Sequence, residues 1–389
     1  MIAWEQRIQL AAHPVAYPLV RGLSRLGPAV RVPRIGVVVS DAGLAREVLM
    51  DGASFTKTGP GSPSDLWTPV LGPSVLLNME GEAHARLREK LAPLFTPAYV
   101  KSLCAKVLAE PLAALAERLR AGSPVDLVAA TQRLAGAVIC ELVGLTADST
   151  FAVRSNERDF FTELYTRGTE LTSMVRLGRR TLTAPQIARA RKTLGTLTAP
   201  AAAAFRAGHK TTVPGTMRRL GLTEAEALGA VAAFILTGTE TIVSYLPRLV
   251  ALCHDTGWLA RLVADPTLAD PVIAEAFRVT VPTPVMLRSV ARPARVGAVR
   301  VRPGDRIVIA TISCARAYGP FDPDRPHPKE LRQLWFGAGP HFCLGMPLAR
   351  AEIDAVLGVL LELGGVRVVS RKASRRVLIP GYERLVVRA

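Results

Sequence analysis

"FGAGPHFCLG", residues 336–345, places a single cysteine, Cys343, among glycine and aromatic residues. Glycine lets a backbone approach something flat and bulky, because it has no Cβ. A helical pattern, "MPLARAEIDAVLGVLLEL", follows directly, with Pro347 where the first turn of a helix tolerates proline. Cys343 therefore stands just ahead of a helix N-terminus, whose unpaired N–H groups and dipole favour a thiolate over a thiol. We predict that a flat group lies on this sulfur.

The composition indicates one large soluble domain covering residues 1–389, since 49% of the residues are hydrophobic and no stretch reads as a linker or an internal repeat. The five cysteines show no metal-ligand spacing, and their odd number argues against a disulfide framework. Glu5 and Arg7 exclude a signal-peptide core at the N-terminus. The longest apolar stretch, "ALGAVAAFILTG", is too short to span a bilayer. We therefore expect a cytoplasmic protein that does not use a membrane.

The chain is strongly basic, with a net charge of +17 and a pI of about 10.4. Nucleic-acid binding is one reading of this charge, but aromatic residues make up only 5% and no recognition motif accompanies the basic residues. A surface matched to an acidic protein partner fits the charge as well.

The hydrophobic periodicity predicts a mainly α fold with small β-sheets. "VRVPRIGVVVS" (30–40) predicts two short strands, and residues 56–75 read as a long Pro/Gly loop, of the kind that is often functional. Helical patterns occupy residues 82–94, 97–120, 125–144, 149–166, 184–207 and 223–253, the last opening with the capping box "TEAE". After these helices we predict Val-rich strands around 285–310, an irregular stretch to 335, the cysteine loop, a helix and C-terminal strands.

A polar cluster, "TGTET" (237–241), interrupts the last of these helices in the middle of an apolar run. Gly238 costs a helix about 1 kcal/mol relative to alanine, and Glu240 places an acid where the flanks are apolar nearly all round. The plain alternative is an amphipathic helix with one polar stripe. Interior carboxylates without a structural pair are often catalytic, so we interpret the cluster as functional.

Other polar residues are unremarkable when taken one at a time. Glu275 and Arg278 in "EAFR" lie one turn apart, as many solvated surface pairs do. Arg288 lies in an apolar strand-like run, where a guanidinium needs an anionic partner. Three further residues fit a structural role equally well when seen alone: His84 and Arg88, on one helix face, and His341, two residues before the cysteine.

Together and in this order, these features resemble the cytochrome P-450 heme-thiolate monooxygenases. The match to F-x-x-G-x-x-x-C-x-G is complete, with Phe336, Gly339, Cys343 and Gly345. "HARLR" (84–88) and "LARAEI" (348–353) are similar to the patterns of the soluble bacterial members. The resemblance extends over nearly the whole chain and implies a single-domain cytochrome P-450 fold.

The resemblance implies a role for each matching residue. Cys343 would be the proximal thiolate and metal ligand of heme b (iron protoporphyrin IX), with Phe336 and the glycines against the porphyrin. His84, Arg88, Arg288 and His341 would hold the propionates, and Glu275 and Arg278 would form a buried structural pair. Glu240 and Thr241 would deliver protons to dioxygen at the heme, where Gly238 would open the helix. The implied substrate pocket comprises Phe234, Thr237, Pro284, Val285, Ile379 and the 56–75 loop.

The implied reaction places one atom of dioxygen into a hydrophobic small molecule, such as a terpenoid, steroid or polyketide. No flavin or iron–sulfur segment is evident, so a ferredoxin and a ferredoxin reductase would supply electrons. The chain departs from the family at Thr237, where alanine is usual, at Ile242, at Pro247 inside the helix, and in "SCARAYG" (313–319). Alternatives are a peroxide-driven variant, a catalytically silent partner-protein activator, which would tend to lose the cysteine, and a heme-based gas sensor.

Overall fold

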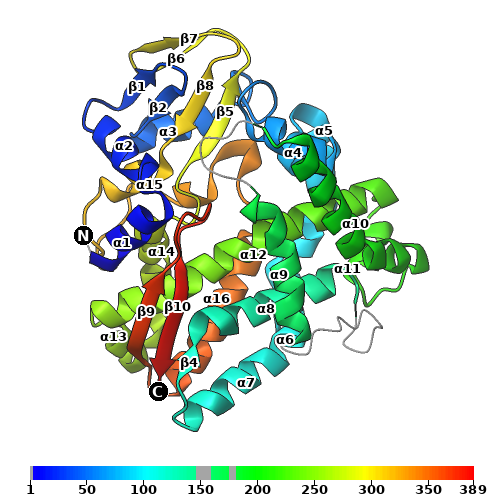
Figure 1. Cartoon of the computed structure of the whole chain (residues 1–389), viewed down its shortest axis with the longest axis vertical. Coiled ribbons are helices and arrows are strands. Elements are labelled where there is room, and N and C mark those ends of the chain that lie inside the picture. The colour runs from blue at the N-terminus through cyan, green and yellow to red at the C-terminus, as the bar shows by residue number, and fades with distance from the viewer. Residues whose placement is uncertain (1–2, 146–158, 175–180) are drawn as a thin grey trace.

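The computed structural model describes residues 3–145, 159–174 and 181–389. A small β-rich region that includes the N-terminus lies at one side of a larger helical region, and a long helix, α12 (Glu224–Asp255), crosses between them (Figure 1). The other helices are α1 (Ala3–Ala12), α2 (Ala16–Leu23), α3 (Ala42–Met50), α4 (Pro63–Leu71), α5 (Gly81–Leu91), α6 (Pro97–Val107), α7 (Ala109–Arg120), α8 (Leu127–Leu142), α9 (Phe160–Ser173), α10 (Ala184–Ala207), α11 (Val213–Arg219), α13 (Trp258–Ala264), α14 (Ala269–Thr280), α15 (Thr311–Arg316) and α16 (Met346–Glu362).

The largest sheet has the strand order β1-β2-β8-β5-β3. The two predicted strands in residues 30–40 are present as an antiparallel hairpin, β1 (Ala29–Val32) and β2 (Gly36–Val39). Strand β8 (Arg306–Ile309) runs parallel to β2 and antiparallel to β5 (Met286–Val290), which in turn pairs with β3 (Phe55–Thr56). The smaller sheets are β4 (Val125–Asp126) with β10 (Tyr382–Arg388) and β9 (Arg367–Ala373), and the hairpin β6 (Ala294–Val296) with β7 (Val299–Val301).

Helix α12 forms the centre of the main core, and its start follows from local chemistry. Thr223 accepts a hydrogen bond from the Glu226 backbone, while the Glu226 carboxylate accepts one from the Thr223 backbone, which confirms the predicted capping box. The helix then packs against α8, α9, α10, α14 and α16. By length and composition it could cross a bilayer, but 56% of its most apolar window is buried inside the protein. Its 32 residues correct our estimate that this apolar segment is too short, and its burial is typical of a core helix.

Several predicted boundaries are wrong, for identifiable reasons. Residues 56–75 are not a continuous loop, because they contain α4, in which Trp67 and Val70 are buried against α10 and α12. The predicted helix 97–120 is two helices that meet at Leu108. This break places Pro111 in the first turn of α7, where its missing N–H is harmless. Helix α15 lies within the stretch predicted to be irregular, and α1 and α2 were not predicted.

The remaining helices agree more closely with their patterns. Helix α10 occupies residues 184–207 as predicted, and the region predicted as 125–144 begins with the short strand β4 before α8. Only part of the predicted helix 149–166 can be compared, since residues 146–158 lie outside the described residues. In the part that is described, α9 begins at Phe160, with Asp159 capping its first turn.

Candidate functional site

The cysteine loop is a tight turn closed onto its own backbone. The Cys343 N–H donates to the Phe336 carbonyl at 2.9 Å, so that the two ends of the motif meet. Gly339 has a φ of +68°, and a Cβ there would lie 2.6 Å from the carbonyl oxygen of Leu49. Only glycine fits this close approach to α3. The motif thus folds into a loop that presents its cysteine at the start of α16.

Cys343 is the one exposed cysteine in a chain whose five cysteines all lie in the described residues. Its sulfur accepts hydrogen bonds from the backbone N–H groups of Gly345 and Met346, the donors expected at the beginning of α16. The pKa of Cys343 is nevertheless raised, because desolvation in the surrounding protein outweighs these donors and the nearby charges of Lys57 and Arg88. The backbone donors at the helix N-terminus therefore favour the thiolate, as expected, but burial has the larger effect on the pKa of Cys343.

Basic side chains gather on this side of the cysteine loop, with Lys57 and Arg88 close enough to the sulfur to lower its pKa. His84 and Arg88 lie on one face of α5, Arg288 is buried on β5, and Lys57 follows β3. Burial, reinforced by the positive charge of Arg288, lowers the pKa of Lys57 to about 7, and burial lowers the pKa of Arg288 to about 10. Both shifts indicate cations that lack full anionic compensation. Sequence reasoning missed Lys57, which lies in the segment predicted to be a loop.

Within the described residues, Glu80 is the carboxylate that contacts this group. It accepts a hydrogen bond from the Lys57 backbone N–H, and its other oxygen lies 2.7 Å from His341 Nε2. Burial raises the pKa of Glu80, but the His341 and Lys57 hydrogen bonds and nearby positive charge lower it more. His341 in turn lies against His84, with ring centroids 4.2 Å apart. Burial, together with the positive charge of neighbouring groups, lowers the pKa of His84 to about 4.

These residues fit the propionate end of a heme. The Nδ1 atom of His341 is buried without a hydrogen-bond partner in the described structure, although buried polar atoms are nearly always paired. Arg288 is buried with its NH1 donating to the neighbouring Leu287 carbonyl at 2.8 Å. When Lys57 is protonated, Lys57, Arg88 and Arg288 carry three positive charges, and among the described residues Glu80 is the carboxylate that offsets them. Two further carboxylates would balance this cluster and give His341 Nδ1 an acceptor.

The centre of α12 opens to solvent where the polar cluster predicted an interruption. Thr237 and Gly238 are exposed, whereas Ile235, Leu236 and Thr239 around them are buried. A Cβ on Gly238 would meet no atom within 4 Å. The Thr241 hydroxyl donates to the carbonyls of Thr237 and Gly238 at 3.3 and 3.4 Å, and the helix stays continuous through this segment and Pro247. Space is thus available beside the helix at the position predicted for oxygen binding.

Glu240 faces α9. Its carboxylate accepts a hydrogen bond from the Thr172 hydroxyl, and Tyr165 lies close enough for Glu240 to raise the pKa of its phenol. Burial raises the pKa of Glu240, and the Thr172 hydrogen bond offsets part of that effect. A carboxyl group with a raised pKa holds its proton more readily than an exposed one, which suits a group that supplies a proton.

Glu275 and Arg278 form a fully buried ion pair behind the cysteine loop. Arg278 donates to both carboxylate oxygens at 2.6 and 2.5 Å, and also to the carbonyls of Ala315, Gly319 and Pro320. His327 lies 2.7 Å from the same carboxylate, and its ring packs edge-on against Trp335 in the loop's first turn. The pair therefore fixes the segment that leads into the cysteine loop.

The predicted substrate-pocket residues come from segments that the structure brings together only in part. Trp67 of α4, Leu236 of α12 and Leu378 belong to one apolar cluster, which places α4, the middle of α12 and the turn before Ile379 side by side. Phe234 is half-buried and packs edge-on against Phe95. By contrast, two predicted residues pack into the neighbouring sheet region, where Pro284 is buried and Val285 contacts the cluster of Val38, Val308 and Ala310.

A second buried ionic network was missed by the sequence reasoning. Arg248, on α12, donates to both oxygens of Glu5 at 3.1 and 2.5 Å, and Arg316 donates to the same carboxylate at 3.2 Å. This network ties α1 to α12 and α15.

In the described residues, no group of three or more His, Cys, Asp or Glu side chains could hold a metal ion. A metal at the cysteine loop would therefore depend on the Cys343 sulfur and a prosthetic group.

Known proteins resemble this chain in sequence and in fold. The sequence model of the family "Cytochrome P450" matches residues 261–375, which include the Glu275–Arg278 pair and the cysteine loop. "Cytochrome P-450 monooxygenase DoxA" of Streptomyces sp. (strain C5) is 29% identical over 90% of this chain and 84% of its own length. The "20-oxo-5-O-mycaminosyltylactone 23-monooxygenase" of Streptomyces fradiae is 31% identical over 36% of this chain and 35% of its own.

Among solved structures, a mutant of P450 EryK, from S. erythraea, in complex with erythromycin B has a TM-score of 0.78 at 22% identity. The alignment covers 98% of this chain and 97% of the other. This likeness confirms the predicted fold class, a mainly α, single-domain fold with small sheets.

Proposed function

Because the chain is a member of the cytochrome P450 superfamily of heme-iron monooxygenases, we propose that it oxidises a hydrophobic natural product with dioxygen. Electrons would come from a separate ferredoxin and ferredoxin reductase in the cytoplasm. The observation that carries the proposal is the exposed residue Cys343, whose sulfur accepts hydrogen bonds from two backbone N–H groups at the start of α16 and lies beside cations that Glu80 compensates only in part. We take residues 1–389 as one catalytic domain.

The cofactor in this proposal is heme b, and its propionates would complete the charge balance beside α5. In the described structure His341 Nδ1 has no hydrogen-bond partner and Arg288 forms no ion pair, and His84 and Arg88 flank them. Cys343 would ligate the iron, with Phe336 and Gly238 near the porphyrin. When bound, a thiolate-ligated heme supplies the oxidising chemistry, because the thiolate favours O–O cleavage.

The protein's own part in the chemistry is to deliver protons. Glu240 has a raised pKa and lies one residue before Thr241, whose hydroxyl is held by the carbonyls of Thr237 and Gly238 at the exposed part of α12. We assign Thr241 to the final hydrogen bond toward dioxygen and Glu240 to the supply of its proton. Thr237 adds a methyl and a hydroxyl at the same opening, which narrows the space available to a substrate.

The substrate class rests on the apolar surroundings of this opening and on the relatives. Trp67, Leu236 and Leu378 belong to one apolar cluster. We propose that Phe234 and Ile379 extend this apolar lining and that Thr237 supplies a hydroxyl. A pocket of this kind binds chiefly by apolar burial, with few polar groups that fix orientation. The named relatives include a tylactone-derivative monooxygenase and a protein bound to erythromycin B. A polyketide, terpenoid or steroid is therefore the substrate class that we propose.

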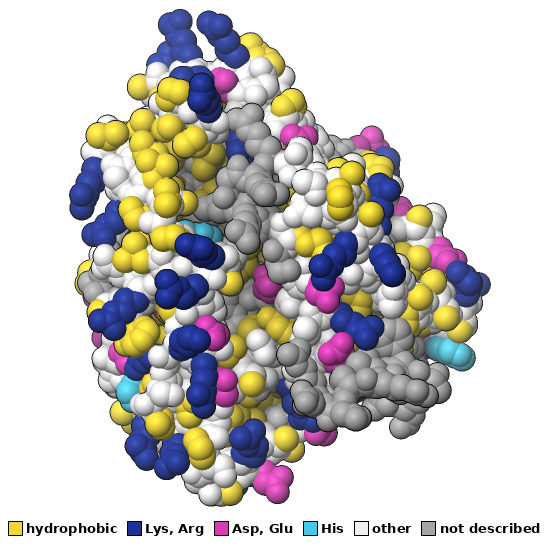
Figure 2. Space-filling view, in the orientation of Figure 1, with side chains coloured by type: hydrophobic (Ala, Val, Ile, Leu, Met, Phe, Trp, Pro, Cys, Tyr) yellow, Lys and Arg dark blue, Asp and Glu magenta, His cyan; other side chains and the backbone are white. Residues whose placement is uncertain are grey.

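Electron transfer would use the basic surface near α5. Basic side chains are scattered over the face seen in Figure 2, with acidic ones interspersed. On α5, Arg86 is exposed and pairs with Glu82, whereas Lys90 lies 3.3 Å from Glu226 of α12. Because Lys90 is tied into the fold, Arg86 is the better candidate contact for an acidic ferredoxin. Arg86→Glu should slow ferredoxin-dependent reduction at low salt and leave the heme spectrum unchanged.

The proposed reaction is tested by reconstitution with a ferredoxin, its reductase and NAD(P)H. A library of hydrophobic natural products is first screened by spectral titration, and compounds that bind are then incubated under labelled dioxygen. The expected result is a product that carries one labelled oxygen atom. Turnover with hydrogen peroxide but not with the electron donors would favour the peroxide-driven variant. Absence of label from every product would contradict monooxygenase activity.

A further inference from the structure

A lysine lies beside Arg288 in the proposed heme site, and it comes from the neighbouring strand of the large sheet. Strand β3 pairs antiparallel with β5, with Thr56 opposite Ser289. The next residue, Lys57, therefore comes to the level of Arg288, which is buried. Like charges that lie opposite each other in a sheet repel and lower its stability. A lysine and an arginine in this arrangement are stabilised when one anion binds both.

The backbone of Lys57 is held on both sides. Its N–H donates to the carboxylate of Glu80, the residue that precedes α5. Its carbonyl accepts a hydrogen bond at 3.2 Å from the N–H of Ser64, in the first turn of α4. The side chain thus extends from a point fixed between three elements, and little backbone freedom is left to lose when it binds a ligand.

The ammonium group of Lys57, by contrast, has no direct partner. Within the described part of the chain, it forms no hydrogen bond and no ion pair. The charge of Glu80 offsets the low pKa of Lys57 in part, but its two oxygens are bound by the Lys57 backbone N–H and by His341 Nε2. Buried or half-buried charges are normally paired, so this ammonium indicates a ligand that supplies an anion.

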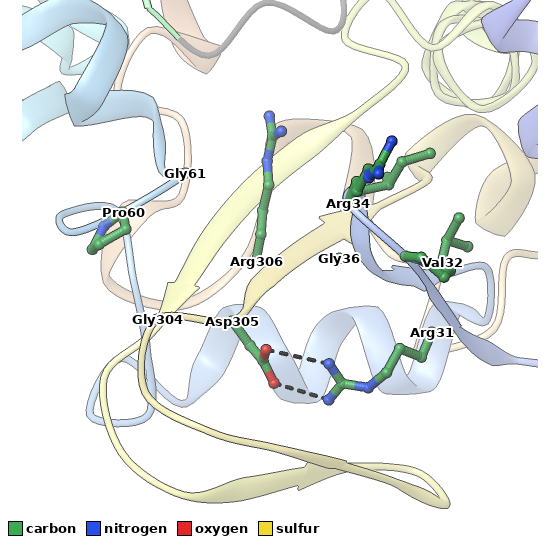
Figure 3. Close-up of a pocket in the computed structure, with 11 residues that line it drawn as sticks. Arg31, Val32, Arg34, Gly36, Pro60, Gly61, Gly304, Asp305 and Arg306 are labelled. Atoms are coloured by element: carbon green, nitrogen blue, oxygen red, sulfur yellow. Dashed lines mark hydrogen bonds and ion pairs between the residues drawn. The ribbon is translucent and has the colours of Figure 1, made fainter.

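Another cation of the same sheet shows the contrast with a paired arginine. At the opposite edge, a pocket of about 420 Å³ is lined by the β1–β2 hairpin and the turn that leads into β8. There Arg31 donates to both oxygens of Asp305, at 3.2 and 2.8 Å (Figure 3). The Asp305 hydrogen bonds raise the pKa of Arg31, whereas burial lowers the pKa of Arg288 to about 10. Arg31 has a carboxylate of its own, which Arg288 and Lys57 lack among the described residues.

Lys57 also lies among the four residues that we assign to the propionates. Burial is the main cause that lowers the pKa values of His84 and His341, and the charge of Lys57 lowers both further. In the same way, Arg288 and Arg88 lower the pKa of Lys57 beyond the effect of burial. The lysine is therefore close to the groups from α5, from β5 and from the cysteine loop.

We propose that Lys57 binds a heme propionate together with Arg288, as a fifth residue of the propionate site. The inference rests on the heme assignment in the proposed function. The lysine ammonium supplies N–H donors, and a carboxylate oxygen accepts from it while the other oxygen faces the guanidinium. One propionate then removes the repulsion between the two cations and leaves neither without an anionic partner.

The test compares the heme-loaded wild type with Lys57→Met and Lys57→Arg. Methionine keeps the length and the apolar stem of the side chain but removes its charge, whereas arginine keeps the charge. Heme loss is followed as transfer from each holoprotein to excess apomyoglobin. Lys57→Met should lose heme about tenfold faster, which is the effect of losing one charge-assisted hydrogen bond. Lys57→Arg should lose heme at nearly the wild-type rate.

Two further measurements report on the heme group directly. The propionate bending band in the resonance Raman spectrum should move to lower frequency in Lys57→Met, because the propionate loses a hydrogen bond. The reduction potential should also fall, because removing a nearby positive charge favours the ferric over the ferrous state. The matched control is Lys101→Met, which removes the same charge from an exposed position on α6 and should leave all three measurements unchanged.

The outcomes separate this inference from the assignment of the heme itself. A Lys57→Met protein with the thiolate band, wild-type heme loss and an unchanged propionate band would overturn the inference and leave the heme assignment intact. Equal changes in Lys57→Met and Lys101→Met would mean that net charge acts, and would overturn it too. So would faster heme loss in both Lys57 variants with the propionate band in place, because Lys57 would then act in packing alone. A wild-type protein without heme would refute the proposed function, and this inference with it.

Discussion

Glu275→Ala should remove a carboxylate with several buried hydrogen-bond partners. Glu275 is fully buried and binds Arg278 through two hydrogen bonds, and it also accepts from the Asp322 backbone at 2.8 Å and contacts His327. Its loss would leave the buried Arg278 guanidinium with only carbonyl partners. An uncompensated buried charge is the outcome that makes such a change costly.

The magnitude follows from the electrostatics of the site. Burial raises the pKa of Glu275, but hydrogen bonds from Arg278 and His327 lower it more, from 4.5 to about 2. At about 1.4 kcal/mol for each pKa unit, the ionised carboxylate contributes about 3 kcal/mol to folding. This stability is complete above pH 4.5 and is lost as the pH falls toward 2. Breaking a buried ion pair typically costs about 3–5 kcal/mol, which agrees with this value.

The assay is urea unfolding of the heme-loaded protein, followed by circular dichroism, with heme content measured for each variant. Glu82→Ala is the matched control, because Glu82 forms an exposed pair with Arg86 one turn away, and such pairs contribute about 0.5 kcal/mol or less. We expect Glu275→Ala to lose about 3 kcal/mol and most of its heme, whereas Glu82→Ala should resemble the wild type. Equal stabilities of the two variants, with full heme loading, would refute the reasoning.

The remaining predictions concern the hydroxyl group of Thr241 and the carboxyl group of Glu352. Thr241→Ala should keep heme and substrate binding but divert reducing equivalents to peroxide, so the product formed per NAD(P)H consumed should fall severalfold; an unchanged ratio would remove Thr241 from proton delivery. Glu352, buried on α16, has a pKa raised by desolvation to about 8. A buried acid whose pKa is raised in the folded state makes the wild-type protein less stable as the pH rises from about 4.5 to 8. Glu352→Gln removes this effect, so the free energy of unfolding of the variant should exceed that of the wild type increasingly across that range, by up to about 5 kcal/mol. Parallel stability profiles of the two proteins against pH would show that Glu352 is ionised or solvated in the folded state.

The sequence was most informative where local chemistry decides the structure. The capping box at Thr223 and Glu226 and the turn of the cysteine loop follow from hydrogen bonds and backbone conformations within a few residues. The proline and glycine content of residues 56–75 concealed α4, because it outweighed the helical spacing of Leu66, Trp67 and Val70. Pro111 could have revealed the break at Leu108, since a proline favours the first turn of a new helix.

Long-range ionic partners could not be predicted. Glu5 and Arg248 are 243 residues apart, and neither the start of α1 nor an arginine on a buried helix specifies the other. Glu80 and Lys57 were missed for the same reason, because their role depends on the folded position of His341 and Arg288. Charge and spacing identify cations in need of a partner, but only the fold determines which carboxylate supplies it.

The central claim, that Cys343 carries the prosthetic group, is tested most directly by the absorption spectrum of the reduced carbon monoxide complex. The wild-type protein should show the red-shifted band of a thiolate-ligated heme, and Cys343→His should shift it to the band of an imidazole-ligated heme. Cys104→Ser is a control, since Cys104 is buried on α6 and its change should leave the band in place. A thiolate band that persists in Cys343→His would contradict the account, because another residue would then be the ligand.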